Sequence, residues 1–228
     1  MLNRNKRNIV KKILMIILMA IPAFSYGKNV AGNDTISARR AFLELPALSL
    51  QLLPKETRED MLIYFDNDSI WSARNALEGR SMLETVSPDY LKVRMTPVST
   101  LQIKIFPGKK GDVVMTVYTV GNAGEGTADS EVRFYDAQMR ELDASGIFKA
   151  PELKDFFLLP KGSRLTIRDI EAQLPFYTVQ LSAAGGSDSV ELIFNPEDYI
   201  SIEGMDMIKP YLKSPIKYSW DGKKLKKQ

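Results

Sequence analysis

The sequence of 228 residues contains no cysteine and no histidine. Without cysteine, the chain has no disulfide, no thiol nucleophile, no thiolate zinc site and no iron–sulfur cluster. Without histidine, it has no Ser-His-Asp triad and no imidazole metal ligand. With 14 Gly and 12 Pro it is too poor in these residues for a collagen-like or low-complexity chain. These absences exclude most nucleophilic and metal-dependent enzymes and leave carboxylates as the generic acid–base groups.

The first 27 residues predict a secretory signal peptide. The segment has no acidic residue, and its basic residues are Arg4, Lys6, Arg7, Lys11 and Lys12. The apolar run of 12 residues from Ile13 to Phe24 is too short for a bilayer span, which takes about 20 residues. Ser25 and Gly27 supply the small residues for a cut before Lys28, and Ala23 and Ser25 would serve a cut two residues earlier. We therefore expect export to the periplasm, the cell surface or the medium, with no transmembrane segment after cleavage. An uncleaved anchor or a buried helix is the alternative.

Removal of this leader reverses the sign of the net charge. The whole chain has 31 basic and 28 acidic residues, and five of the basic residues lie in the leader. The remainder is therefore slightly acidic, whereas a nucleic-acid-binding domain needs a clustered basic excess. We expect no nucleic-acid partner. The lysines at the end of the chain predict a solvated basic tail, with attraction to anionic lipid or glycan as the alternative; they are Lys223, Lys224, Lys226 and Lys227.

After the leader, the sequence predicts a flexible lead-in (28–37), one compact α+β unit (38–222) and the basic tail (223–228). Helical patterns cover Ala38–Leu45, Lys55–Phe65, Ile70–Leu77, Pro151–Leu159 and Met205–Leu212. Strand patterns cover Tyr90–Met95, Leu101–Phe106, Val113–Val120, Asp129–Asp136, Phe176–Ala183, Val190–Phe194 and Ile216–Trp220. The first two strands alternate apolar with polar residues, which predicts one face in water. The expected fold class is α+β, an antiparallel β-sheet meander with short helices packed on one face.

Two similar α-then-β halves, residues 38–145 and 146–222, are one interpretation of this order. Asp129–Phe134 and Asp188–Phe194 both begin with Asp-Ser and both follow a glycine-containing loop. A tandem duplication would produce this similarity. Chance is the alternative, because Asp and Ser commonly begin a strand after a turn.

Three segments resemble a known family of uncharacterised exported proteins. They are LPALSLQLLPKETREDMLIYFDND (45–68), LEGRSMLETVSPDYLKVRMTPVSTLQIKIFP (77–107), and VVMTVYTV (113–120) followed by DSEVRFYD (129–136). The family carries a domain-of-unknown-function label and is found in anaerobic gut and oral Gram-negative bacteria of the Bacteroidales type. The resemblance implies export and a compact α+β fold. It implies no reaction and no catalytic residue.

No motif in the sequence predicts a catalytic, cofactor or metal site. Asp66–Ser69 begins like a calcium loop, but Ile70, Trp71 and Leu77 then occupy positions that an EF-hand gives to a ligand, Gly and Glu. Gly121–Gly126 lacks the spacing of a phosphate loop and predicts a hairpin loop. The serines beside Asp129 and Lys161 lie at turn signals, where serine usually bonds the backbone.

Aromatic residues are the better candidates for a functional surface. We predict an interaction surface at Phe176, Tyr177, Tyr211 and Trp220, with Tyr211 and Trp220 partly exposed near the basic tail. The main hypothesis is a non-enzymatic module that binds an envelope protein or glycan, by shape or by an uncovered strand edge. The alternatives are a carboxylate-based glycan hydrolase, which needs two carboxyl groups in one pocket, and a small-ligand carrier, which needs a closed cavity.

Overall fold

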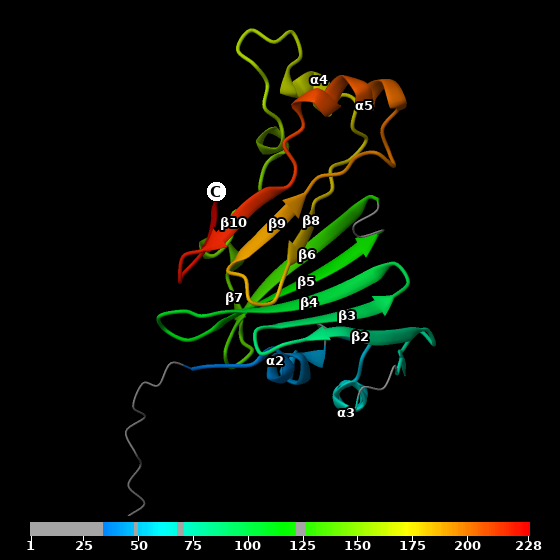
Figure 1. Ribbon diagram of the computed structural model, residues 1–228, viewed down its shortest axis with the longest axis vertical. Coiled ribbons are helices and arrows are strands. Elements are labelled where there is room, and N and C mark those ends of the chain that lie inside the picture. The colour runs from blue at the N-terminus through cyan, green and yellow to red at the C-terminus, as the bar shows by residue number, and fades with distance from the viewer. Residues whose placement is uncertain (1–33, 48–49, 68–70, 122–125) are drawn as a thin grey trace, which may run out of the picture. The chain divides into compact units, whose positions relative to one another are not determined.

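Two antiparallel β-sheets form the framework of the protein (Figure 1). The computed structural model describes residues 34–47, 50–67, 71–121 and 126–228. The first sheet has seven strands in the order β1-β2-β3-β4-β5-β6-β7, and the second has four in the order β11-β10-β9-β8. With a few short helices, this arrangement confirms the predicted α+β class. None of the helices described is long and apolar enough to cross a membrane. The predicted signal peptide lies outside the described residues.

The first sheet is a meander in which each strand pairs with the next along the chain. Its strands are β1 (Ala73–Arg74), β2 (Arg80–Val86), β3 (Tyr90–Thr96), β4 (Ser99–Phe106), β5 (Val113–Gly121), β6 (Ala128–Asp136) and β7 (Glu141–Leu142). The four strands predicted from residue 90 to residue 136 are confirmed. Residues of β5 are buried on both faces: Val114 belongs to the apolar cluster of one face, and Met115 and Val117 belong to the cluster shared with the second sheet.

The helix predicted over Ile70–Leu77 is wrong in its described part, where β1 and the β1–β2 turn lie instead. Asn75, a buried polar residue, explains the turn. Its Oδ1 accepts hydrogen bonds from the backbone N–H groups of Leu77 and Gly79, both at 3.1 Å. Its Nδ2 donates to Ser81 Oγ and to the Met95 carbonyl, again at 3.1 Å. The last bond reaches β3, so nothing in the local sequence shows it.

The second sheet is formed by β8 (Gln180–Ala183), β9 (Ser189–Ile193), β10 (Ile216–Trp220) and β11 (Leu225–Lys227). The predicted hairpin and the strand at 216–220 are confirmed, although the first strand of the hairpin begins at Gln180 and not at Phe176. The four lysines of the predicted solvated tail are exposed, but residues 225–227 also form a strand, in which β11 pairs with β10 in the register Trp220↔Leu225. Asp221 makes the turn possible, since its Oδ1 accepts hydrogen bonds from the backbone N–H groups of Lys223 and Lys224.

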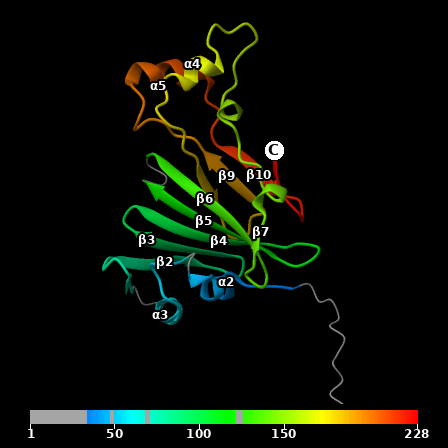
Figure 2. The ribbon, with the colours of Figure 1, turned by 180° about the vertical axis from the view of Figure 1, so that it is seen from behind.

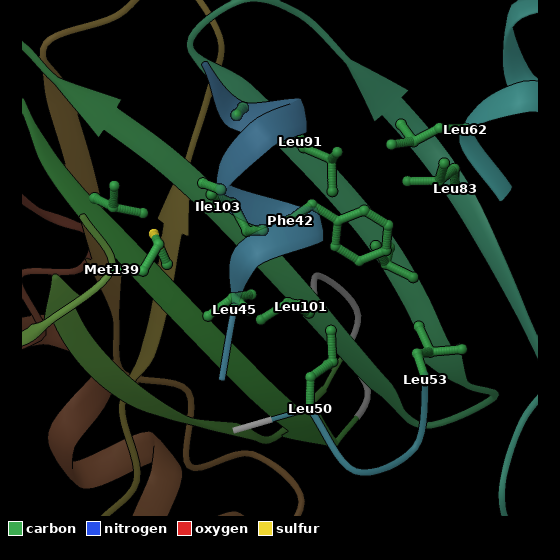
Figure 3. Packing of buried hydrophobic residues seen from close by; sticks show 14 of the residues in the cluster. Phe42, Leu45, Leu50, Leu53, Leu62, Leu83, Leu91, Leu101, Ile103 and Met139 are labelled. Carbon is green, nitrogen blue, oxygen red and sulfur yellow. The ribbon is translucent and has the colours of Figure 1, made fainter. Parts of the chain in front are cut away.

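Two helices, α2 (Ala38–Glu44) and α3 (Lys55–Asp66), pack on one face of the first sheet (Figure 2). We call this the helix face. Ser37 begins α2, because its Oγ accepts from the Arg40 N–H at 3.2 Å. The buried Arg58 of α3 donates to the carbonyls of Phe42 and Leu45 at the end of α2. A guanidinium stabilises this end of a helix. Figure 3 shows Phe42 pointing from α2 into the apolar cluster of the helix face.

The other helices accompany the second sheet. They are the 3₁₀ helices η2 (Ala144–Gly146), η3 (Leu153–Phe156) and η4 (Lys209–Tyr211), and the α-helices α4 (Ile167–Glu171) and α5 (Ile202–Ile208). The helix predicted over 151–159 is therefore only a short 3₁₀ turn. α5 lies between β9 and β10, whereas no α-helix within the described residues lies between strands of the first sheet; the proposed duplication stays a hypothesis.

A second apolar core lies between the second sheet and the opposite face of the first sheet. Its residues on the first sheet include Phe106, Met115, Val117 and Phe134. The face of β4 that the alternating pattern placed in water is buried here: Gln102 is 5% exposed and Lys104 is 1% exposed. The prediction of a wet face was wrong for β4, because the second sheet covers it.

Gln102 joins the two sheets through its amide. Its Oε1 accepts from the Ala183 N–H at 3.0 Å and from the Tyr90 hydroxyl at 3.1 Å, and its Nε2 donates to the Leu181 carbonyl at 3.3 Å. Leu181 and Ala183 direct these backbone groups toward the outer edge of β8, which pairs with no further strand among the described residues. The side chain of Gln102 therefore satisfies backbone groups that would otherwise be buried without partners.

Lys104 and Asp89 fix the β8–β9 turn to the first sheet. Lys104 Nζ lies 2.5 Å from Asp89 Oδ2, and the same oxygen accepts from the Gly186 N–H at 2.9 Å. Gly186 has a φ of 68°, a conformation that glycine adopts without strain. The ammonium of a buried lysine is thereby paired with a carboxylate that also holds a backbone N–H group.

We expect this ion pair to respond asymmetrically to substitution. Asp89→Ala leaves the buried Lys104 without a counter-charge and should lower the free energy of unfolding by about 3–5 kcal/mol. Lys104→Met removes the buried charge and keeps an apolar side chain of similar length, so it should cost less. The double variant should be more stable than Asp89→Ala alone. Denaturant unfolding measures all three, and additive costs would contradict the pairing.

The free energy of unfolding should also depend on pH, through the ionisation of Asp89. Burial alone would raise the pKa of Asp89, but hydrogen bonds from Lys104, Gly186 and Ser87 outweigh it and hold the pKa below its ordinary value. A depressed pKa means that the carboxylate stabilises the fold above about pH 4 and that this stabilisation is lost as pH falls further. Asp89→Asn should flatten the acid limb of a stability–pH curve. Asp60→Asn removes an exposed carboxylate of α3 and is the matched control, and an equal flattening in this variant would contradict the role of Asp89.

Candidate functional site

Of the four aromatic residues predicted as an interaction surface, Phe176, Tyr177 and Tyr211 keep some exposure and Trp220 is buried. Trp220 was predicted to be partly exposed, and this is wrong because only 9% of it is exposed. It occupies an inward position of β10, its ring stacks on Phe106 at 4.9 Å between centroids, and its Nε1 donates to the Pro107 carbonyl at 2.7 Å. Trp220 therefore belongs to the core between the sheets.

The other predicted residues keep some exposure. Phe176 is 52% exposed and packs against Tyr199 in a tilted arrangement, with 4.2 Å between ring centroids. Tyr177 is 38% exposed, and its hydroxyl donates to the Pro151 carbonyl at 3.2 Å. Tyr211 is partly buried in η4. Phe176 and Tyr177 precede β8, whereas Trp220 ends β10, and their ring contacts are with different residues.

A hollow of about 300 Å³ lies on the helix face, where the cover of helices stops. We call it the β5–β6 groove. It is lined by Leu45, Leu50, Gln51, Leu52, Met95, Leu101, Thr116, Tyr118, Glu131, Arg133 and Tyr135. This volume is at the small end of the range of roughly 300–1,000 Å³ for ligand pockets. The groove is open to solvent and can hold a single ring or a short side chain.

The apolar wall of the β5–β6 groove comes from the connection between the two helices. α2 packs over β3 and β4, so the chain that leaves its end passes along the boundary with β5. Figure 3 shows Leu45, Leu50 and Leu101 close together at this end of α2. Arg58 fixes the position of this wall, because it binds the carbonyl of Leu45 at 3.2 Å.

The polar wall of the β5–β6 groove comes from cross-strand pairs. In the β5–β6 register, Tyr118 lies opposite Glu131 and Thr116 opposite Arg133. The alternation of β6 sends Val132 and Phe134 to the other face, against the second sheet. The sequence DSEVRFYD contains this alternation, so the outward direction of Glu131 and Arg133 was predictable. Their position opposite Leu45, Leu50 and Leu52 was not.

The charges of the polar wall neutralise each other. Arg133 Nη2 lies 2.6 Å from Glu131 Oε1, and the hydrogen bond that the guanidinium donates to this carboxylate raises the pKa of Arg133. The Tyr118 hydroxyl donates to Ser99 Oγ at 3.3 Å, which fixes the orientation of the ring. The groove therefore offers hydrogen-bond donors and acceptors on one side, an aromatic ring on its floor and aliphatic groups on the other side. Its lining contains one carboxylate, which is ion-paired.

Two further hollows lie elsewhere. One is on β1–β3, lined by Ser72, Arg80, Met82, Arg94 and Pro97. The other is on the outer face of the second sheet, lined by Ser182, Ala183, Ala184, Ser187, Ser189, Glu191 and Lys217. The single carboxylate of the latter, Glu191, lies 3.2 Å from Lys217 Nζ. Neither lining contains a pair of carboxylates.

The described residues of the serine and calcium-like motifs form bonds within the protein, as expected of structural residues. Ser130 Oγ accepts from the Leu181 N–H at 2.9 Å, and Ser163 Oγ accepts from the Leu165 N–H at 3.2 Å. Asp66 is ion-paired with Arg39 at 2.6 Å, while residues 68–70 of the calcium-like segment lie outside the described residues. Residues 122–125 also lie outside, but Gly121 pairs with Ala128, so β5 and β6 form the predicted hairpin. No group of three acidic side chains suited to a metal ion occurs in the described ranges.

Substitution should separate the buried from the exposed aromatic residues. Trp220→Ala removes a ring from the core and its hydrogen bond to Pro107, and should lower the free energy of unfolding by about 3–5 kcal/mol. Phe176→Ala removes a ring that is half exposed and should cost less than about 1 kcal/mol. Denaturant unfolding at one pH checks both. Equal costs would contradict the burial of Trp220.

Comparison with known proteins identifies a family and a fold. No curated protein matches the chain. A solved domain of an uncharacterized protein from Porphyromonas gingivalis W83 is similar, with a TM-score of 0.70 and 21% identity, over 86% of this chain and 98% of that chain. This likeness concerns the fold alone. The family described as proteins of unknown function (DUF3256) matches residues 32–225. The chain therefore belongs to the DUF3256 family, an unknown-function family of the Bacteroidales type, as the resemblance predicted.

Proposed function

We propose that the protein is an exported, non-enzymatic binding module of the bacterial cell envelope, and that the β5–β6 groove binds a sugar ring of an envelope glycan. One observation carries this proposal: the groove has an aliphatic wall, an aromatic floor and a polar wall. A sugar ring has a face of C–H groups and an edge of hydroxyl groups. The C–H face can pack on Tyr118 and Leu101, and the hydroxyl groups can form hydrogen bonds with Glu131 and Arg133.

The expected export supports an envelope partner. The basic segment and the apolar run of residues 1–27 have the pattern of a cleaved signal peptide. The remainder of the chain is slightly acidic, which suits a neutral ligand better than a polyanion at a site whose charges cancel. The groove therefore discriminates by shape and hydrogen bonding.

The charge of the groove weighs against the alternative of a carboxylate-based hydrolase. Such an enzyme places two carboxyl groups about 5–9.5 Å apart, and its general acid has a raised pKa. The β5–β6 groove contributes only Glu131, which is paired with Arg133. Wherever a carboxyl group of the described residues has a shifted pKa, as at Asp89, Asp136 and Asp155, the pKa is lowered. A carrier of small ligands would need an enclosed cavity, whereas this groove is open.

The strand edges are short or already occupied, which favours binding of a partner on a sheet face over addition of a partner strand at a sheet edge. β1 and β7 are two-residue strands at the ends of the first sheet. The outer edge of β8 is occupied by Gln102 and Ser130. β2 extends past β1 but carries an irregularity between Leu83 and Thr85. Short and irregular edges are the usual protection against added strands.

A binding assay tests the proposal. The purified protein is incubated with peptidoglycan and with soluble envelope polysaccharides, and the bound fraction is measured. Tyr118→Ala removes the aromatic floor and should weaken binding by about tenfold. Tyr64→Ala removes another partly exposed ring, on α3, and should leave binding unchanged. Thermal unfolding of both variants verifies that each is folded.

The same experiment distinguishes the alternatives. Release of reducing sugar ends by the protein, abolished by Glu131→Gln, would replace the binding proposal with a hydrolase. Retention of an envelope protein but of no glycan, again lost with Tyr118→Ala, would replace the glycan with a protein partner. Binding that is equally weakened by Tyr64→Ala would show that the groove is not the site.

A further inference from the structure

Basic side chains gather on the part of the first sheet that the second sheet leaves uncovered. Leu83, Leu91 and Val93 are buried on the helix face, so the alternation of β2 and β3 places their neighbours on the opposite face. These neighbours include Arg80, Met82, Glu84, Lys92 and Arg94. β8 contacts β5 and β6 and does not extend over β2 in the described chain (Figure 1).

A hollow of about 420 Å³ lies among these side chains, and we call it the arginine hollow. Its lining consists of Ser72, Arg80, Met82, Arg94 and Pro97, with no carboxylate. Arg80 is held in place, because its Nε donates to Ser72 Oγ at 2.5 Å and its Nη2 to the Ser72 carbonyl at 2.8 Å. These bonds fix the guanidinium through one edge and leave Nη1 available to a ligand.

The charges around the arginine hollow are not balanced. Glu84 is shared by two cations, at 3.0 Å from Lys92 Nζ and 3.8 Å from Arg94 Nε. Arg80 forms no ion pair within the described residues. Three cations and one carboxylate therefore face the same solvent-exposed region. A dianion placed between Arg80 and Arg94 would neutralise the excess.

We propose that the arginine hollow binds a phosphate monoester carried by a saccharide. Guanidinium groups bind phosphate through two parallel hydrogen bonds, and a phosphate monoester is close to a dianion at neutral pH. The saccharide follows from the size and composition of the hollow, which is larger than a phosphate group needs and includes the apolar surfaces of Met82 and Pro97. This site is independent of the β5–β6 groove, because the groove lies on the helix face.

Titration calorimetry of the purified protein tests this proposal, with glucose 6-phosphate, inorganic phosphate and glucose as the three probes. Glucose 6-phosphate should bind more tightly than inorganic phosphate, and glucose should not bind. Arg80→Gln and Arg94→Gln should each weaken binding of glucose 6-phosphate by about tenfold. Glu84→Gln should strengthen it, because it removes the carboxylate that competes for Arg94. Arg168→Gln, at an exposed arginine on α4, should have no effect.

Several results would overturn the proposal. Equal affinity for inorganic phosphate and glucose 6-phosphate would show that the saccharide is not part of the recognised ligand. Weaker binding in Glu84→Gln, or equal weakening in Arg168→Gln and Arg80→Gln, would show that the arginine hollow is not the site. Arg80→Lys is the control for a folding defect. It keeps the positive charge but loses the planar guanidinium, so it should bind more weakly than the parent protein while its melting temperature stays unchanged. Tyr118→Ala should leave this binding intact even if the groove binds no glycan.

Discussion

A buried polar joint between the two sheets is the interaction on which the rest of the structure depends. Gln102 and Lys104 project from β4 into the contact, where they are 5% and 1% exposed. A charge or an amide in this position is stable only if its hydrogen bonds are satisfied. Ala183, Leu181 and Asp89 satisfy them, so the second sheet can pack against the first only in the position that brings these partners together. The apolar residues around the joint supply stability, and the joint selects one arrangement among many.

This arrangement explains where the two candidate sites occur. The helices cover β3 and β4 on one face, and the second sheet covers β5 and β6 on the other. Each cover is narrower than a seven-stranded sheet, so each face keeps an uncovered part. On the helix face this part is the neutral β5–β6 groove beside β6. On the opposite face it is the basic arginine hollow beside β2. The two covers are offset from each other, and the offset gives one small protein two surfaces of different chemistry.

Local patterns were sufficient for the central strands and insufficient for the contacts between them. The alternation in β3 and β4 and the β-branched run of β5 predict strands correctly, because strand formation depends on neighbours two residues apart. The same alternation misplaced Gln102 and Lys104 in water, since their partners lie at Asp89 and beyond residue 180. Trp220 was expected to be partly exposed because it lies near the four terminal lysines, whereas β11 pairs beside it and Leu225 turns inward. The β5–β6 groove combines Leu45 and residues 50–52 with side chains of β5 and β6, and no local pattern connects them.

Because the chain has no histidine and no cysteine, the carboxyl groups are the residues to consider for acid–base chemistry. A carboxyl group can act as a general acid near neutral pH only if its surroundings raise its pKa, by burial or by a second carboxylate nearby. Here the surroundings act in the opposite direction: hydrogen bonds and cations lower the pKa of Asp89, Asp136 and Asp155, and each of these groups holds a turn, a lysine or an arginine. Their charge is used to fix backbone segments in place. Rigid faces with fixed charges favour recognition, because a ligand then loses little free energy in ordering the protein that receives it.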